Sequence, residues 1–315
     1  MPPPRLPTPL IGTVAIVGIG LIGSSIARAA ARSGAVARIV VCDCDPDALA
    51  RAEALRLGQS YLRAVAEAVA DADLVILCAA VGANAEIAEA MAPALKPGAI
   101  VSDVGSVKSA VVADVGPRLP EGVHFVPAHP VAGTEYSGPD AGFATLFINR
   151  WCILTPPPGT DPAAVDKVRA FWAALGANVE IMTPEHHDLV LAITSHVPHL
   201  IAYNIVGTAA DLEEVTRSEV IKFSAGGFRD FTRIAASDPT MWRDVFLHNK
   251  DAVLEMLGRF SEDLTALQRM IRRGDGQGLF DLFSRTRAIR RGIVEQGQET
   301  AAPDFGRRAP EAEGG

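Results

Sequence analysis

Cysteine is scarce in this sequence, and aromatic residues are few. Only four cysteines occur among 315 residues, and aromatic side chains make up 6% of the chain. The cysteines lack the paired spacing of a zinc site, so no metal centre is expected, and thiols in apolar runs are typical of reduced cysteines in a cytoplasm. The four residues are Cys42, Cys44, Cys78 and Cys152.

Positive charge is also in short supply. The chain has 29 lysine and arginine residues against 37 aspartate and glutamate residues, which gives a formal net charge of −8. Nucleic-acid binding needs a basic face, so this balance argues against a nucleic-acid partner. An anionic substrate would therefore have to be bound by a few locally placed arginine, lysine or histidine side chains.

Long apolar segments are the third feature that the sequence lacks. The start, MPPPRLPTPL, is rich in proline and has no apolar run of signal-peptide length. Along the rest of the chain, we expect no segment of the length needed to cross a membrane. The sequence therefore predicts a soluble protein of the cytoplasm that makes no membrane contact.

The pattern of apolar residues changes once along the chain. From residue 13 to residue 182, short β-branched runs such as TVAIV and ARIVVC alternate with Ala-rich helical stretches. Such alternation favours a parallel sheet covered by helices. From 183 to 296 the strand signal stops, and an all-helical domain is predicted. Residues 1–12 and 297–315 are expected to be flexible tails.

The predicted helices of the second half lie at 185–210, 212–223, 239–273 and 276–295. Several of them are apolar over much of their circumference, as in DLVLAITSHVPHLIAYNIVG. A small domain cannot easily cover such helices by itself, so we expect a homodimer with a helical interface.

A glycine-rich turn, GIGLIG, directly follows the first predicted strand. Gly18 permits the tight turn, Gly20 lets the backbone approach a pyrophosphate, and Gly23 allows close packing of helix on strand. Free N–H groups at the start of the next helix, at Leu21 and Ile22, would hold the pyrophosphate. Strand, turn and helix together predict a Rossmann-type nucleotide-binding domain rather than a structural glycine turn.

Asp43 ends the second predicted strand at the expected interval after these glycines. Its carboxylate can accept hydrogen bonds from the adenosine ribose hydroxyls, and it would repel the 2′-phosphate of NADP. Neither Cys44 nor Asp45 offers a compensating positive charge. NAD is therefore the expected cofactor.

His129, which follows the predicted strand VHFVP, is the natural acid–base candidate, because imidazole titrates near neutrality. A dehydrogenase acting on an alcohol carbon needs a group that takes the hydroxyl proton while hydride leaves. The alternative is a loop histidine packed between two prolines, and the residues alone favour neither interpretation.

His196 and His199 are three residues apart in SHVPH, which puts both on one face of a helix. A metal pair is one interpretation, but no nearby acid completes a ligand set. We expect that one histidine packs in the core while the other lines a cleft.

The stretch GGFRDFTRIA is expected to be an anion-binding loop that precedes a helix. It combines two glycines, two aromatic residues and two arginines, and an arginine there could bind a carboxylate through both of its terminal nitrogens. For Arg229, a solvated turn with Asp230 as ion-pair partner is the favoured interpretation.

Taken together, these segments resemble the prephenate/arogenate (cyclohexadienyl) dehydrogenase family of tyrosine biosynthesis. The match runs from about Thr13 to Gly297. Its most specific pieces are GIGLIGSS, DVGSVK, PAHPVAGTEYSGP, SHVPHL and GGFRDFTRIAASDPTMW. The resemblance implies a Rossmann domain and a helical substrate and dimerisation domain, with the active site in the cleft between them.

The resemblance also implies roles for particular residues. His129 matches the base that hydrogen-bonds the ring hydroxyl, and Ser106 matches the serine that supports this base near the nicotinamide. Arg233 matches the arginine that binds a substrate carboxylate. The other positions implied for the substrate are His199, Thr134, Glu135, Ser195, His196 and Trp242. Ala80, where relatives often have proline, and Val81 are implied for the cofactor.

The implied reaction is the oxidative decarboxylation of prephenate to 4-hydroxyphenylpyruvate or of arogenate to tyrosine, with NAD accepting the hydride. The sequence leaves the choice between these substrates open. A β-hydroxyacid dehydrogenase of similar architecture is the alternative enzyme; it would use a lysine base such as Lys222 or Lys250. A non-catalytic dimer that senses NADH is a third possibility, and it would not need the candidate side chains to converge.

Overall fold

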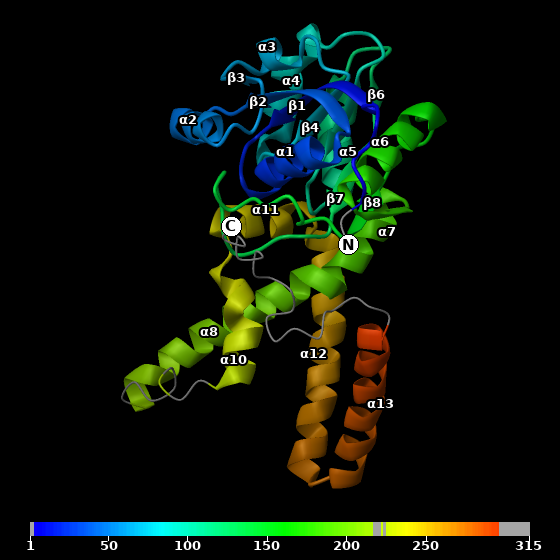
Figure 1. Ribbon diagram of the computed structural model, residues 1–315. Helices are drawn as coiled ribbons and strands as arrows, with labels where there is room; N and C mark the ends of the chain where they lie inside the picture. Colours follow the sequence, from blue (N-terminus) through cyan, green and yellow to red (C-terminus); the bar gives the residue numbers. More distant parts are fainter. Residues whose placement is uncertain (1–2, 217–221, 223–224, 296–315) are drawn as a thin grey trace. The chain divides into compact units, whose positions relative to one another are not determined.

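A six-stranded parallel sheet organises the first half of the chain (Figure 1). The computed structural model describes residues 3–216, 222 and 225–295, and it divides into two compact units, Met1–Val253 and Leu254–Gly315. The strand order, β3-β2-β1-β4-β5-β6, is that of a Rossmann domain. The strands are β1 (Ile11–Val17), β2 (Val36–Cys42), β3 (Ser60–Leu62), β4 (Leu74–Leu77), β5 (Ile100–Asp103) and β6 (His124–Phe125).

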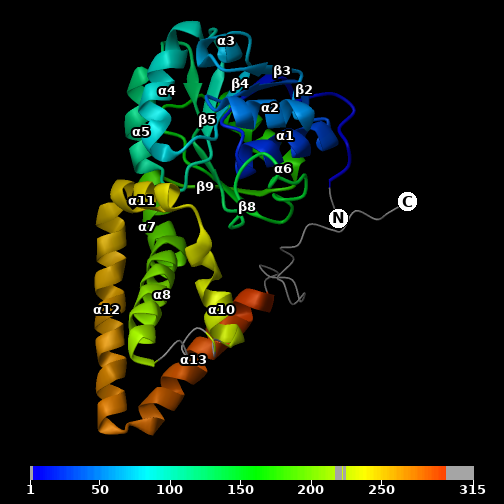
Figure 2. The same cartoon turned by 90° about the vertical axis from the view of Figure 1, so that its left-hand side faces the viewer.

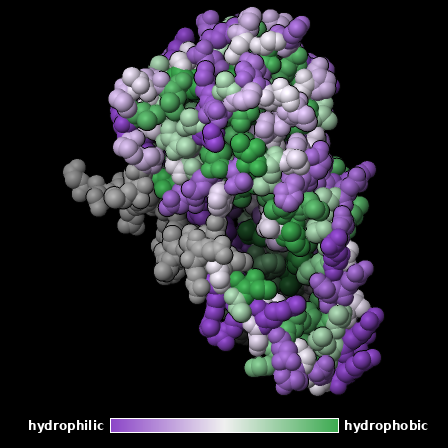
Figure 3. Space-filling view, turned by 90° about the vertical axis from the view of Figure 1, so that its right-hand side faces the viewer, coloured by the Kyte–Doolittle hydropathy of each residue, from purple (hydrophilic) through white to green (hydrophobic). Residues whose placement is uncertain are grey.

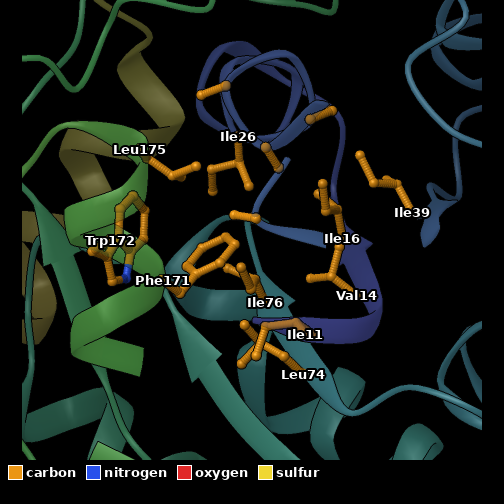
Figure 4. Packing of buried hydrophobic residues seen from close by; sticks show 14 of the residues in the cluster. Ile11, Val14, Ile16, Ile26, Ile39, Leu74, Ile76, Phe171, Trp172 and Leu175 are labelled. Atoms are coloured by element: carbon orange, nitrogen blue, oxygen red, sulfur yellow. The ribbon is translucent and has the colours of Figure 1, made fainter. Parts of the chain in front are cut away.

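Strands of this sheet are apolar on both faces, because helices cover both. Along β1, Val14 and Ile16 face one cluster of buried residues, while Ala15 and Val17 face the other. The first face is covered by α1 (Leu21–Ser33), α2 (Pro46–Ala54) and α6 (Pro162–Leu175), whose Trp172 and Leu175 lie beside Ile26 (Figure 4). The second face is covered by α3 (Val65–Val69), α4 (Asn84–Met91) and α5 (Ser109–Val115).

A second, three-stranded sheet contains strands that the sequence analysis assigned to the parallel series. It consists of β7 (Ala128–Pro130), β8 (Trp151–Leu154) and β9 (Asn178–Ile181). β7 runs antiparallel to β8, and β8 runs parallel to β9. The predicted parallel sheet is therefore confirmed, but these three segments do not belong to it. Alternating apolar residues do not specify which neighbour a strand pairs with, so the sequence could not separate the two sheets.

The segment expected as an N-terminal tail is tied to the Rossmann domain over part of its length. The amide of Leu6 donates to the carbonyl of Ser33 at 2.7 Å, and that of Leu10 donates to Ala35 at 2.9 Å. The expected tail at 297–315 lies outside the described residues. The same holds for 217–221 and 223, which make up half of the helix expected at 212–223.

One long helix follows β9. It comprises α7 (Pro184–Leu191), the π-helical turn η4 (Ala192–His196) and α8 (Val197–Thr216) (Figure 2). Pro198 has no N–H to donate and its ring would clash with the carbonyl four residues earlier. The wide turn, in which the Val197 amide bonds to the Ala192 carbonyl, accommodates this proline without a break.

The expectation that no segment could cross a membrane is wrong as to length. Pro184–Asp211 forms 28 helical residues and contains an 18-residue window with a mean hydropathy of 1.5, which by length and composition alone would suffice. However, His187, Asp188 and His196 on this helix are buried and hydrogen-bonded to other elements of the same unit. These contacts fix the first part of the helix to the Rossmann domain, as in the helix of a folded domain rather than a membrane span.

The segment expected as an anion-binding loop is helical. Gly226–Thr232 forms α10, and Arg233–Ala236 continues as the 3-10 turn η5. The single helix expected at 239–273 is two helices, α11 (Pro239–His248) and α12 (Lys250–Arg273), which meet at Asn249. Asn249 leaves the helical conformation, and its buried side chain donates to the Asp188 carbonyl. This contact, rather than local helix propensity, accounts for the break between the two helices.

The remaining elements are short or lie in the second unit. The 3-10 turns are η1 (Val81–Ala83), η2 (Ala92–Ala94) and η3 (Gly116–Arg118). The second unit contains most of α12, and α13 (Gly276–Glu295), joined at a turn in which Gly274 has a φ of 65°. Hydrophobic side chains reach the surface among hydrophilic ones on the face drawn in Figure 3. Exposed large apolar residues also occur on the helices of the second half. On α12 and α13 these are Leu254, Leu264, Ile271, Phe280, Phe283 and Ile289.

Candidate active site

The turn between β1 and α1 has the geometry of a dinucleotide-binding loop. Gly18 has a φ of 97°, and a Cβ there would lie 2.7 Å from the backbone carbonyl carbon of Cys78. A Cβ on Gly23 would lie 2.1 Å from the Gly18 oxygen, whereas nothing lies within 4 Å of one on Gly20. Gly18 and Gly23 are therefore required by packing, and Gly20 leaves open space at the start of α1.

The first N–H groups of α1, including those of Leu21 and Ile22, receive no side-chain cap from Gly20. These donors suit an anion such as a pyrophosphate. The Asp43 carboxylate, one residue beyond β2, accepts from the Ile19 amide at 2.8 Å and from the Asp45 amide at 3.0 Å. Each carboxylate oxygen keeps a further lone pair for a ligand hydroxyl. The residues present therefore fit a dinucleotide.

Ala80 and Val81 lie in the turn after β4, at the same carboxyl edge of the sheet. Ala80 is the N-cap residue of η1, and Val81 is buried in the cluster beneath α4 and α5. Gly82, the next residue, faces the Asp244 carboxylate of α11, since a Cβ there would lie 3.0 Å from Asp244 Oδ2. The cofactor side of the site thus contacts the helix that carries Trp242.

His129 lies in the middle of β7 and is 7% exposed. Its Nδ1 is 2.8 Å from Nε2 of His187 on α7, and Nδ1 of His187 is 2.9 Å from the Asp188 carboxylate. Burial, assisted by the nearby cationic groups, lowers the pKa of His129 well below its ordinary value. Burial likewise lowers the pKa of His187, although the bond to Asp188 opposes the shift. Both imidazoles are therefore neutral at neutral pH.

A buried ion pair anchors the loop that carries Ser106. Lys108 Nζ contacts the Asp103 carboxylate, and both side chains are fully buried. Lys108 Nζ also donates to the Ala128 carbonyl at 2.8 Å, and the Ala128 amide donates to Asp103 at 3.1 Å. The end of β5 is thereby fixed to the strand residue before His129. Ser106 is half-buried within this loop, and its backbone is near enough to His196 to affect the pKa of that histidine.

The π turn places His196 and His199 in different surroundings. His196 is fully buried, and its Nδ1 accepts from Asn249 Nδ2 at 3.1 Å. Burial lowers the pKa of His196 to about 4. His199 is half-buried, and its Nδ1 donates to the Ser195 carbonyl at 2.8 Å. His196 is thus the histidine that packs in the core, and the expectation that the other, His199, lines a cleft stays a prediction.

His199 connects the aromatic and cationic parts of the site. Its ring stacks on Trp242, with centroids 3.7 Å apart and planes inclined by 24°. The charge of Arg233 assists burial in lowering the pKa of His199. Arg233 Nη1 lies 2.7 Å from the Glu135 carboxylate, and Glu135 follows Thr134, whose hydroxyl accepts from the Tyr136 amide at 3.3 Å. Arg233 Nε is buried without a hydrogen-bond partner.

Contacts therefore connect the predicted chemical residues in two groups. One runs from His199 through Trp242, His196, Asn249, Asp188 and His187 to His129. The other is the ion pair of Arg233 with Glu135, whose arginine lies near enough to His199 to lower the pKa of that histidine. Arg229, in contrast, is exposed on α10, and Lys250 is exposed at the start of α12. The sequence analysis missed His187, Asp188, Asn249 and the pair of Asp103 with Lys108. The acid next to a histidine in PEHHDLV was the available signal for the first two.

Comparison with known proteins shows which family the chain resembles over most of its length. The sequence matches the nucleotide-binding domain of prephenate dehydrogenase over residues 26–181 and its dimerization domain over residues 183–285. It is 43% identical to the cyclohexadienyl dehydrogenase of Zymomonas mobilis over 277 residues, which are 88% of this chain and 94% of that protein. It is 36% identical to the prephenate dehydrogenase of Bacillus subtilis over 301 residues, 93% of this chain and 79% of that protein.

Solved structures show the same fold. The prephenate dehydrogenase of Aquifex aeolicus, in complex with hydroxyphenyl propionate and NAD+, superposes with a TM-score of 0.84 at 36% identity. That match covers 90% of this chain and 98% of the other. The arogenate dehydrogenase of Synechocystis gives a TM-score of 0.74 at 26% identity, covering 89% and 99% of the two chains. The chain therefore belongs to the prephenate dehydrogenase family of oxidoreductases.

Proposed function

We propose that this protein is a cytoplasmic enzyme of tyrosine biosynthesis that oxidises and decarboxylates prephenate, arogenate or both, with NAD as cofactor. The observation that supports this most is that buried contacts join His129, a neutral histidine, to His199, and that the charge of Arg233, the candidate carboxylate-binding residue, acts on the same His199. An oxidative decarboxylation of a hydroxylated ring needs one base and one anchor for a carboxylate. The dinucleotide-binding turn lies at the carboxyl end of β1.

The cofactor site uses the turn and the two strand ends beside it. Gly18, Gly20 and Gly23 bring the backbone close to the pyrophosphate, and the amides at Leu21 and Ile22 donate to it. Asp43 binds the adenosine ribose, while Ala80, Val81 and Ser106 contact the nicotinamide half. When bound, NAD accepts a hydride from the ring carbon that bears the hydroxyl group.

His129 manages the single proton of the reaction. Its Nδ1 is engaged with His187, so Nε2 is the atom that accepts the hydroxyl proton of the substrate. Ser106 supports this base from the neighbouring loop. The ring carboxylate leaves as carbon dioxide, and the gain of aromaticity drives the reaction forward, so the protein chiefly orients the reactants and excludes water.

The substrate side is formed by the group around Arg233. Arg233 binds a substrate carboxylate, with His199 and Trp242 as neighbours that shape the cleft. Ser195 and His196 support His199 on the side away from the substrate. Thr134 and Glu135 lie near the substrate's side chain, which is the part that differs between prephenate and arogenate. A carboxylate at Glu135 suits the ammonium group of arogenate, whereas Arg233 and His199 suit a keto acid, so both substrates are expected to react.

The helical half supplies the dimer. We assign residues 13–182 to NAD binding and 183–296 to substrate binding and dimerisation. The exposed apolar side chains on α8, α12 and α13, including Ile205, Val206, Phe280 and Phe283, would be covered by a second copy of the chain. A monomeric mass in solution would contradict the dimer.

The direct test is to follow NADH formation by absorbance with purified protein. Prephenate and arogenate are supplied in parallel, first with NAD and then with NADP. Turnover of either substrate supports the proposal, and the two kcat/KM values give the preference. If neither substrate reacts while NAD still binds, the proposed function is wrong. Oxidation of a β-hydroxyacid instead would support the alternative enzyme.

A further inference from the structure

Three buried side chains lie in line behind the proposed base. The Asp188 carboxylate is 2.9 Å from His187 Nδ1, and His187 Nε2 is 2.8 Å from His129 Nδ1. His187 is fully buried, and Asp188 and His129 are 4% and 7% exposed. Of these three residues, only His129 takes part in the proposed proton transfer.

The Asp188 carboxylate is held rigidly. Its Oδ1 accepts from the Lys108 amide at 2.7 Å, and its Oδ2 accepts from the Ser109 amide at 2.9 Å. The Asp188 carbonyl accepts from Asn249 Nδ2 at 2.9 Å. Burial alone would raise the pKa of Asp188, but the hydrogen bonds from His187, Ser109 and Lys108 lower it below its ordinary value. Asp188 is therefore an ionised acceptor.

These contacts fix where the protons are on both rings. An ionised carboxylate can only accept, so His187 carries its proton on Nδ1. Since His187 is neutral, its Nε2 has a lone pair and can only accept as well. His129 must then carry its proton on Nδ1, which leaves Nε2 unprotonated.

We infer that His187 and Asp188 are positioning residues for the proposed reaction: they hold His129 in the tautomer whose Nε2 can act as the base. This rests on the proposed function. As the substrate O–H bond breaks and a bond forms between that proton and Nε2, His129 becomes an imidazolium. Its Nδ1–H remains donated to His187, and the Asp188 carboxylate compensates the positive charge through the His187 ring.

The other charged or titratable groups around His187 do not set the tautomer of His129. Lys108 is engaged with Asp103 and the Ala128 carbonyl, and His196 is engaged with Asn249. Within the described part of the chain, neither of these side chains hydrogen-bonds to the His129 ring, whereas His187 does. The tautomer of His129 therefore depends on His187.

The test compares His187→Phe, His187→Gln and Asp188→Asn with a matched control, His186→Gln. His186 is the adjacent histidine on the same helix, and it is exposed. With prephenate and NAD, we expect His187→Phe to lower kcat about 100-fold, the usual contribution of a correctly poised base, with little change in KM. His187→Gln, which keeps an acceptor for His129, should recover part of that loss. Asp188→Asn should lower kcat, and the control should leave it unchanged.

A spectroscopic readout separates this role from simple packing. In protein labelled with 15N at histidine, NMR should show His129 protonated at Nδ1 in the unmodified chain and in the control. In His187→Phe the Nε2–H form should appear, provided that circular dichroism shows a folded protein; if that variant does not fold, His187→Gln and Asp188→Asn decide.

Two results would overturn the inference: an Nε2–H tautomer in the unmodified chain, or kcat values of folded His187 variants equal to that of the control. The tautomer is measured without substrate. A chain that turns over neither prephenate nor arogenate but shows Nδ1–H on His129 would therefore refute the proposed function and leave the assignment of the pair intact.

Discussion

The imidazole of His199 lies on the indole of Trp242, with ring centroids 3.7 Å apart and an interplanar angle of 24°. Trp242 is 6% exposed and also meets His196 edge-on at 6.0 Å. His196 at the end of the π turn and His199 in α8 thus both contact one side chain from α11, and the position of the His199 ring depends on a helix more than forty residues away in sequence.

Replacing Trp242 should therefore act through His199. Trp242→Leu removes the stacked ring, and because such a ring pair contributes about 0.5–1.5 kcal/mol, we expect KM to rise by up to about tenfold. Trp242→Phe keeps an aromatic face and should have a KM near that of the unmodified enzyme. Steady-state kinetics with both variants provides the measurement. Equal KM values for the two would show that the stack does not position His199 for substrate.

Arg233 is expected to bind a substrate carboxylate with two parallel hydrogen bonds. Arg233→Lys keeps the charge but loses the planar pair of donors, so KM should rise about 10- to 100-fold, the equivalent of one charge-assisted hydrogen bond. The matched control is Arg229→Lys on the same helical segment, where the arginine is exposed. If both variants raise KM equally, the effect is one of helix stability and Arg233 has no special role.

Local sequence patterns predicted the parts of this site that are built locally. The GIGLIG turn needs only a strand before it and a helix after it, and Asp43 follows from the length of one β–α–β segment. The pair of Arg233 with Glu135 spans 98 residues, and that of His129 with His187 spans 58. Such pairs are set by tertiary packing, so spacing could not predict them.

The inward-facing residues of the helical half were harder to predict, because they too depend on tertiary packing. PEHHDLV is also the sequence of an ordinary exposed helix start, with Thr183 as its cap. Only the docking of α7 onto the Lys108 and Ser109 amides shows that His187 and Asp188 face inward while His186 does not. Likewise, the glycines in GGFRDFT suggested a loop, but that segment is helical as α10.

His129 should be needed for turnover but not for cofactor binding. His129→Asn keeps a polar side chain on β7 without a base, and kcat should fall by about 10²- to 10⁴-fold, the range for loss of general-base catalysis. NAD affinity, measured by quenching of protein fluorescence, should be unchanged. His124→Asn is the control, because His124 is partly exposed on β6. Retained activity in His129→Asn would refute the assignment of the base.

Asp43 should control the choice between NAD and NADP. Its carboxylate is fixed by the Ile19 amide, so a 2′-phosphate on the ribose would meet an immobile negative charge. Asp43→Ser should raise kcat/KM with NADP relative to NAD by about tenfold or more, which corresponds to roughly 1.4 kcal/mol. Asp47→Ser removes a charge from the exposed first turn of α2 and serves as the control. An unchanged ratio in Asp43→Ser would show that another group selects the cofactor.

Acid should destabilise the protein through its buried histidines. The pKa of His196 is lowered to about 4 by burial, and burial also lowers the pKa values of His129, His187 and His199. The unfolded chain therefore binds more protons than the folded chain once the pH falls below about 6.5, the ordinary histidine pKa. The free energy of unfolding should therefore keep its full value above that pH and should fall steadily as the pH is lowered toward 4.

His196 offers the sharpest test of this pH dependence. The lowered pKa of His196 alone should reduce the free energy of unfolding by about 2 kcal/mol between pH 7 and pH 5. His196→Asn retains an acceptor for Asn249 but cannot be protonated, so its melting temperature should fall less over that interval than that of the unmodified protein. His186→Asn, at an exposed site, should show the unmodified pH dependence. If His196→Asn loses as much stability as the unmodified chain, His196 does not bind the proton that is taken up on unfolding.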